Sequence, residues 1–199
     1  KAPMPKPIGQ QPSANGTDKS AQAAPAKKAD SFDFEFELKR INSLISVSDK
    51  NANAYFNRGW LYEYKGDLQL AEKDYSKAIA LDKKNKDAYY NRGLLYIKMK
   101  KYEAAVEDFS EVLKLDPNAG DALCNRGSAK LQMGRIDPAL TDFEAGLKIK
   151  PGDPDLLYNQ GLALLAKGNK PGAMEAFKKA DDAGHPKATD RLKTQAPKS

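Results

Sequence analysis

The sequence contains very few of the residue types that most enzyme sites and disulfide frameworks need. Among its 199 residues there is one cysteine, Cys124, and one histidine, His185. A single cysteine excludes an intramolecular disulfide, and no residues cluster with metal-ligand spacing. No glycine-rich loop has the spacing of a phosphate-binding motif. The sequence therefore favours a protein without catalytic activity, metal or cofactor.

Long apolar runs are also missing, and the central part of the chain has no excess of charge. No apolar stretch approaches the roughly 18 residues that suggest a membrane-spanning helix. The ends supply the net charge of +6: residues 1–30 carry five Lys against two Asp, and residues 187–199 carry four Lys or Arg against one Asp. Of the 33 basic and 27 acidic residues, 24 of each sign remain for residues 31–186. This distribution argues against nucleic-acid binding and against membrane insertion of this segment.

Residues 1–30 have almost no large apolar side chains and are rich in Pro, Ala, Lys, Gln and Ser. Such a segment cannot bury enough surface to offset its ordering entropy, so it is predicted to be a flexible linker or tail. It would suit a tether to an anchor farther upstream. The start at Lys1 rather than Met fits either a processed or a shortened chain. We expect a processed protein of the bacterial cell envelope or periplasm, with the cytoplasm as the alternative.

From residue 52 onward the sequence repeats with a period of 34 residues, in copies at 52–85, 86–119, 120–153 and 154–186. Each copy has helical apolar spacing twice, with a break near its fifteenth position. Small residues at positions 8 and 20 let two helices cross closely, so each copy is predicted to be a helical hairpin. A hairpin cannot bury both of its faces alone, so the copies must stack. The position-8 residues are Gly59, Gly93, Gly127 and Gly161, and the position-20 residues are Ala71, Ala105, Ala139 and Ala173.

These features resemble the tetratricopeptide repeat (TPR), in which an aromatic residue, Gly and Tyr precede Ala-x3-Phe and Pro. The resemblance implies an all-α fold, a right-handed α-solenoid of four hairpins, and a function in protein binding. Toward the end of copy four the proline slips by one place, which is similar to the junction of Sel1-like repeats. Copy two shows the signature with Tyr89, Gly93, Tyr96, Ala105, Phe109 and Pro117.

Two flanking segments extend the array. Residues 34–47 lie one period before the second helix of copy one, so that Ile41 and Ile45 fall where Tyr75 and Ile79 fall. We therefore expect an N-terminal capping helix within residues 31–51. The alternation of aromatic and polar residues from Phe32 onward also fits a strand. At the other end, residues 187–199 are expected to form a short capping helix and a basic tail.

Three copies carry an arginine at position 7 and an aspartate sixteen residues later, and the fourth copy lacks both. A cation that appears and disappears together with one carboxylate fits a salt bridge between the two helices of a hairpin better than it fits a ligand site. Such a pair contributes about 0–1 kcal/mol if exposed, and more if it is enclosed and bidentate. The pairs are Arg58–Asp74, Arg92–Asp108 and Arg126–Asp142; copy four has Gln160 and Ala176.

An asparagine occupies position 6 of all four copies. In TPR proteins this position faces the concave side, where its amide can hold a peptide backbone through donor and acceptor. Bonding within the helix pair or to water is the alternative. Aromatic residues on the same stripe suggest a partner surface, unless the 34–47 helix or the tail covers them. The predicted peptide-binding residues are Asn57, Asn91, Asn125, Asn159, Phe56, Trp60, Tyr64, Tyr90, Leu94 and Asp121.

The residues themselves argue against one known TPR function. Co-chaperone TPR domains bind C-terminal carboxylates through lysines, asparagines and an arginine, but here Asp121 and Asp155 stand at a lysine position and would repel a carboxylate. The sequence thus predicts a non-enzymatic scaffold that binds an extended peptide segment of a partner protein in its concave groove. The alternative is a self-assembling structural protein, a homo-oligomer formed through terminal repeats or through a tail in a neighbour's groove.

Overall fold

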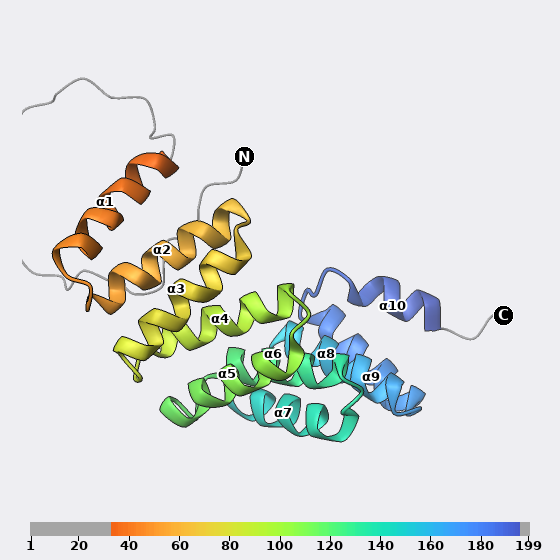
Figure 1. Cartoon of the computed structure of the whole chain (residues 1–199). Coiled ribbons are helices and arrows are strands. Elements are labelled where there is room, and N and C mark those ends of the chain that lie inside the picture. The colour runs from red at the N-terminus through yellow and green to blue at the C-terminus, as the bar shows by residue number, and fades with distance from the viewer. Residues whose placement is uncertain (1–32, 196–199) are drawn as a thin grey trace, which may run out of the picture.

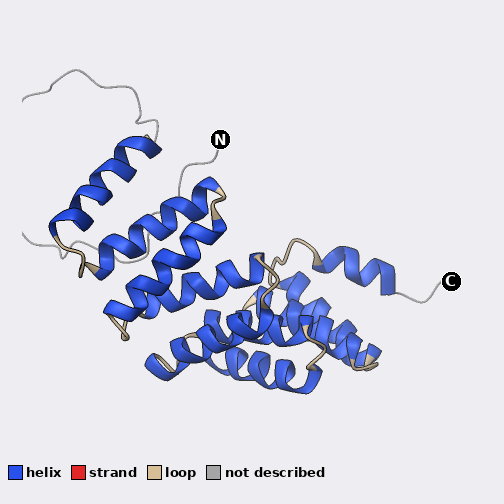
Figure 2. Cartoon of the chain, viewed as in Figure 1, coloured by secondary structure: helices blue, strands red, loops and turns tan. Residues whose placement is uncertain are grey.

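The computed structural model describes residues 33–195, which form ten α-helices and, within that range, no strand (Figures 1 and 2). This confirms the all-α prediction. The predicted linker at 1–30 and the end of the basic tail lie outside the described residues. The helices are α1 (Phe34–Val47), α2 (Ala52–Lys65), α3 (Leu68–Leu81), α4 (Lys86–Lys98), α5 (Tyr102–Leu115), α6 (Gly120–Gln132), α7 (Ile136–Ile149), α8 (Pro154–Ala166), α9 (Lys170–Asp182) and α10 (Ala188–Gln195).

The starts of the helices repeat the period of the sequence. The first helices of the hairpins, α2, α4, α6 and α8, begin at residues 52, 86, 120 and 154, and α10 begins one period later at 188. The second helices, α3, α5, α7 and α9, begin at 68, 102, 136 and 170, and α1 begins one period earlier at 34. Four complete hairpins are therefore flanked by a lone second helix at the N-terminal end and a lone first helix at the C-terminal end.

Local signals set the ends of these helices. Asn51 and Asn85 precede first helices, and each side chain accepts a hydrogen bond from the backbone N–H three residues later. This satisfies a donor that the helix leaves unpaired. Gly66 ends α2 with φ of 94°, a left-handed conformation that glycine adopts without steric cost. Lys100 takes the corresponding place after α4 with φ of 57°, which is unfavourable for a residue with a Cβ atom.

The core of each hairpin is an aromatic ring against a glycine. A Cβ atom on Gly59 would lie 2.9 Å from the ring of Tyr75, and one on Gly161 would lie 2.6 Å from the ring of Phe177. The position-24 ring therefore fills space that the glycine leaves within its own hairpin. It also packs toward the neighbouring hairpin, because Tyr75 shares a buried cluster with Ala88 and Leu95. The four rings, Tyr75, Phe109, Phe143 and Phe177, are fully buried.

The C-terminal junction is held by the only histidine. His185 is buried, and its ring stacks on Tyr158 with centroids 4.0 Å apart. Its Nδ1 accepts a hydrogen bond from the backbone N–H of Lys187 over 3.2 Å, just before α10 begins. Its Nε2 lies 3.4 Å from the carboxylate of Asp155. The histidine thereby links α8 to the start of α10.

Candidate functional site

The first helices line the inside of the curved array. Each of α2, α4 and α6 contacts the next first helix, whereas consecutive second helices within the described residues are farther apart. A stack with this asymmetry curves toward its first helices, and solenoids of this kind present their inner surface to partners. We call the side of α2, α4, α6 and α8 that carries the position-6 asparagines the inner surface. It is the candidate site.

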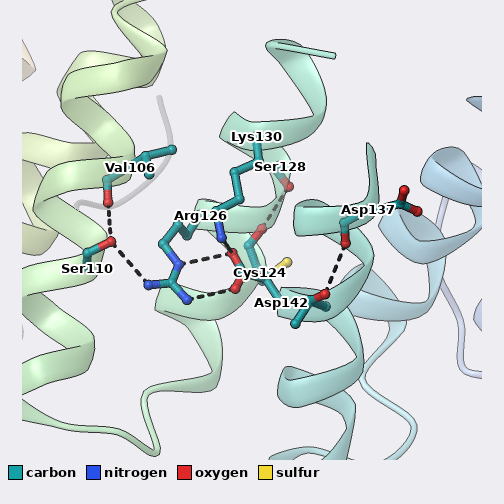
Figure 3. A network of polar contacts seen from close by, with 9 residues as sticks. Val106, Ser110, Cys124, Arg126, Ser128, Lys130, Asp137 and Asp142 are labelled. Carbon is teal, nitrogen blue, oxygen red and sulfur yellow. Dashed lines mark hydrogen bonds and ion pairs between the residues drawn. The ribbon is translucent and has the colours of Figure 1, made fainter. Parts of the chain in front are cut away.

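The arginines at position 7 are occupied by structural partners and do not belong to this site. Arg126 donates from Nε and Nη2 to the carboxylate of Asp142 over 3.0 and 2.7 Å, and from Nη1 to Ser110 Oγ over 3.1 Å (Figure 3). Ser110 lies on the second helix of the preceding hairpin, so each arginine joins two hairpins as well as two helices. The other two arginines form the same contacts, Arg58 with Asp74 and Asn42, and Arg92 with Asp108 and Ser76.

Tyrosines enclose the guanidinium groups in the first two hairpins. Arg58 lies over the rings of Tyr55 and Tyr62, at 5.4 and 5.9 Å from their centroids, and Arg92 has two tyrosines in the same places. In the third hairpin Lys130 replaces the second tyrosine and forms an ion pair of 2.7 Å with Asp142 (Figure 3). All three aspartates are buried, so their charge is balanced inside the hairpin and is not displayed to a ligand.

The position-6 asparagines lie half-buried on the inner surface, and the structure shows what their amides contact. Asn125 donates from Nδ2 to the hydroxyl of Tyr90 over 2.9 Å, and Asn159 donates to the sulfur of Cys124 over 3.5 Å. Both bonds reach back 35 residues to position 5 of the preceding hairpin. For Asn91 the position-5 residue of the preceding hairpin is Phe56, whose side chain has no hydrogen-bond acceptor. Asn91 instead donates from Nδ2 to the backbone carbonyl of Asp87 over 2.9 Å. For Asn57, no side-chain hydrogen bond to another described residue is present.

The predicted aromatic residues divide into two groups. Trp60 and Tyr64 stack on each other with ring centroids 6.0 Å apart, and Tyr64 is 57% exposed. Phe56 is only 8% exposed and packs against Tyr75. The ring of Tyr90 packs edge-on against Phe109, and burial raises the pKa of its hydroxyl. Position 5 thus lies at the margin of the core. Trp60 at position 9 is half-buried and packs partly against the clusters of α1, α2 and α3, whereas Tyr64 at position 13 is exposed.

Two of the three aspartates at position 2 of copies two to four have basic neighbours that the sequence analysis did not identify. Asp121 is exposed and forms an ion pair of 2.6 Å with Lys150, which comes from the end of the same copy. Asp155 lies beside His185, as described above. Asp87 forms no ion pair with another described residue, and the residue one period before Lys150 is an aspartate, Asp116, which pairs with Lys86. Leu94, the last of the predicted residues, is half-buried against the core cluster of α5 and α6.

The sequence reading also missed Glu63, which links the first two hairpins at the inner surface. Its carboxylate accepts a hydrogen bond from the hydroxyl of Tyr75 over 2.9 Å and forms an ion pair with Lys98 of the next hairpin. A signal for this contact was present, since Tyr75 is the only tyrosine among the four position-24 aromatics. A buried tyrosine hydroxyl needs a partner.

Within the described residues, no group of three or more His, Cys, Asp or Glu side chains could hold a metal ion. Burial raises the pKa of the Cys124 thiol to about 11, so the reactive thiolate is scarce at neutral pH. No helix between residues 33 and 195 combines the length and apolar character needed to cross a bilayer.

Comparisons with known proteins agree with this architecture. Sequence models of the tetratricopeptide repeat match residues 52–85 and 87–119, and residues 124–188. No curated protein matches the sequence. Among solved structures, a crystal structure of MamA is 26% identical, with a TM-score of 0.72 over 78% of this chain and 91% of that chain. Another MamA crystal structure is 25% identical, with a TM-score of 0.71 over 83% of this chain and 89% of that one. The fold is also that of pilF from Pseudomonas aeruginosa, at 19% identity and a TM-score of 0.68, covering 82% of this chain and 79% of pilF.

Proposed function

This chain belongs to the tetratricopeptide repeat family, a fold of protein–protein interaction scaffolds, and we propose that its inner surface binds an extended peptide segment of a partner protein. The observation that carries the proposal is the stacked pair of Trp60 and Tyr64 at one end of a row of asparagines. Aromatic residues at the surface supply much of the binding energy in protein interfaces. The protein would act without catalysis, as a binding module.

The asparagines suit a peptide backbone even where their Nδ2 atoms already have partners. Each amide oxygen can accept a hydrogen bond from a peptide N–H. In Asn57 the Nδ2 donors can also reach a peptide carbonyl, whereas those of the other three asparagines already have partners. The residues beside them at position 9 differ from copy to copy, so they would select the side chains of the segment. They are Trp60, Leu94, Ser128 and Leu162.

Charge favours a segment with a lysine or arginine near α4. Asp87 has no ion pair with a described residue, whereas Asp121 and Asp155 face Lys150 and His185. A cation of the partner close to Asp87 would gain a charge-assisted contact. A free C-terminal carboxylate at the same place would be repelled. The preference for a basic segment therefore rests on α4 more than on α6 or α8.

The proposal is tested by selecting peptides from a random library on the purified protein and measuring their affinities. Trp60 is the only tryptophan, so its fluorescence reports binding directly. We expect selected peptides to carry a basic residue, and Tyr64→Ala and Asn57→Ala each to weaken binding by about fivefold or more, as true interface anchors do. Asn118→Ala is the matched control, because Asn118 is exposed in a loop between hairpins.

Both inner-surface variants should unfold at the same urea concentration as the parent protein, since neither side chain is buried. If the selected peptides bind the parent and the two variants with equal affinity, the inner surface is not the recognition site. The same conclusion follows if the library yields no binding peptide and no partner segment quenches Trp60.

A further inference from the structure

The described chain begins beside the inner surface. The ammonium group of Lys65, the last residue of α2, lies over the ring of Phe34, the first residue of α1, at 4.8 Å from its centroid. The beginning of α1 therefore lies at the end of α2 (Figure 1). Trp60 packs against the same apolar cluster as Phe34, and Tyr64 directly precedes Lys65. The 32 residues before Asp33 thus join the described chain next to the aromatic pair of the inner surface.

The inner surface of the first two hairpins has cations at one end and a carboxylate at the other. Lys98, at the end of α4, forms an ion pair with Glu63 near the end of α2, so these two helix ends lie side by side. Lys65 lies at the same end. Asp87 lies at the opposite end, in the first turn of α4, and forms no ion pair with another described residue. A segment that enters at the end of α2 meets the cations first and Asp87 last.

The sequence just before α1 has the matching order of charges. Residues 1–32 carry five Lys against two Asp, and the two lysines nearest α1 are Lys27 and Lys28. Asp30 lies between these lysines and α1, and Phe32 is the only aromatic residue of the segment. Counted back from α1, the segment therefore offers an aromatic ring, then a carboxylate, then two cations. This is the order in which the inner surface presents its aromatic pair, its cations and its free carboxylate.

The segment is also long enough to reach Asp87. The 14 residues of α2 make it about 21 Å long, which about six or seven extended residues span. Lys27 and Lys28 precede Asp33 by six and five residues. A chain that runs back along α2 from Asp33 therefore brings these lysines to the beginning of α4. A lysine beside an unpaired carboxylate gains a charge-assisted hydrogen bond.

We propose that residues 27–32 of this chain occupy its own inner surface at α2 and α4, and compete there with the segment of the partner protein. The aromatic residue of the segment packs on the pair of Trp60 and Tyr64, and one of its lysines pairs with Asp87. The proposal rests on the proposed function, because it assigns regulation to the same site. A segment tethered this close has an effective concentration in the millimolar range, so a weak contact is enough to fill the site.

The first experiment locates the segment without any peptide. A carbodiimide joins an amine directly to a carboxylate, and mass spectrometry of the digested protein identifies the linked residues. In the full chain we expect links from Lys27 or Lys28 to Asp87 to be several times more frequent than links to Asp121, which holds the same position one period later and already pairs with Lys150. A mixture of isotope-labelled and unlabelled chains should show that the links to Asp87 lie within one chain.

The second experiment measures the competition. A partner peptide binds only those molecules in which the segment has left the site, so a segment that fills the site in about four of five molecules lowers the apparent affinity about fivefold. Lys27→Glu with Lys28→Glu should therefore bind library-selected peptides about fivefold more tightly than Lys1→Glu with Lys6→Glu. This control makes the same change of charge in the same segment, farther from α1. Saturating peptide should also remove the links to Asp87 in the wild-type chain.

Three results would overturn the proposal. The first is that links to Asp87 are no more frequent than links to Asp121. The second is that the links join only different chains, which would make a second copy the occupant. The third is equal affinity of the two double variants for the selected peptides, a result that leaves peptide binding by the inner surface in place. If neither variant binds any peptide, the proposed function and the competition both fail, whereas the links within one chain still show where the segment binds.

Discussion

Removing the guanidinium of Arg92 should cost more stability than removing the side chain of Asn57 or Tyr64 on the inner surface. Its side chain donates to Asp108 over 2.8 and 2.7 Å and to Ser76 over 2.8 Å. The side chain of Asp108 is only 4% exposed, against 18% for Arg92. Arg92→Ala therefore leaves a buried carboxylate without its partner. We expect a loss of about 3–5 kcal/mol in the free energy of unfolding at pH 7.

Asp108→Ala should cost less, about 2–3 kcal/mol, because the remaining guanidinium lies nearer the surface and can turn toward water. The double variant Arg92→Ala with Asp108→Ala removes both partners, as in the fourth hairpin, which has Gln160 and Ala176 at these positions. Its loss should be smaller than the sum of the single losses by at least about 1 kcal/mol. Urea unfolding followed by far-UV circular dichroism measures all three variants. Strict additivity would refute the coupling.

The pH dependence of the Arg92→Ala loss provides a second check. Burial already raises the pKa of Asp108, and Arg92 opposes that effect. Without Arg92 the folded-state pKa rises further above the unfolded value. A carboxyl with a raised pKa contributes stability that is present at low pH and is lost as the pH rises through the folded pKa. The deficit of the variant relative to wild type should therefore shrink between pH 7 and pH 5, and an equal deficit at both values would contradict the buried, unpaired carboxylate.

Two glycine substitutions of opposite sign test the hairpin geometry by the same unfolding assay. Lys100→Gly should stabilise the protein by up to about 1 kcal/mol, because it removes the strain of a side chain at positive φ, a conformation that Gly66 and Gly134 adopt in the equivalent turns. A loss of stability would show that the turn is not strained. Gly127→Ala should destabilise the protein by about 1–3 kcal/mol, because the new Cβ would lie 2.6 Å from a ring carbon of the buried Phe143. An unchanged unfolding midpoint would mean that the ring can move aside.

The sequence alone predicted the helices because the period of 34 residues supplies four independent readings of each position. For example, the pairing of Arg with Asp can be recognised because the fourth copy lacks both residues and has Gln160 and Ala176 in their places. The same reasoning reaches α1, where Asn42 bonds Arg58 as Ser76 bonds Arg92 one period later. Repetition converts a weak local pattern into a strong one.

The inner surface was harder to predict because helical periodicity places a side chain only to within a broad stripe. Phe56 and Tyr64 belong to the same stripe, yet one packs into the core and the other is exposed. The ion pair of Asp121 with Lys150 joins residues 29 positions apart and depends on how the chain turns between hairpins. The bond from Asn125 to Tyr90 crosses between hairpins. That bond depends on the angle at which two hairpins stack, which no single copy encodes.

The structure separates the residues that hold hairpins together from those that vary. Position 7 is arginine in three hairpins, and each arginine contacts the preceding second helix. Each also pairs with a buried aspartate, so we expect the two residues to change together. Position 9, two residues away on the same helix, carries tryptophan, leucine, serine and leucine in turn. A scaffold built this way can alter its specificity at position 9 while the stacking energy stays with position 7. A substitution at Ser128 should therefore change which peptide binds and leave the unfolding midpoint in place. Substitutions at Arg92 should do the reverse, and a variant that changed both in proportion would show that binding and stacking share the same residues.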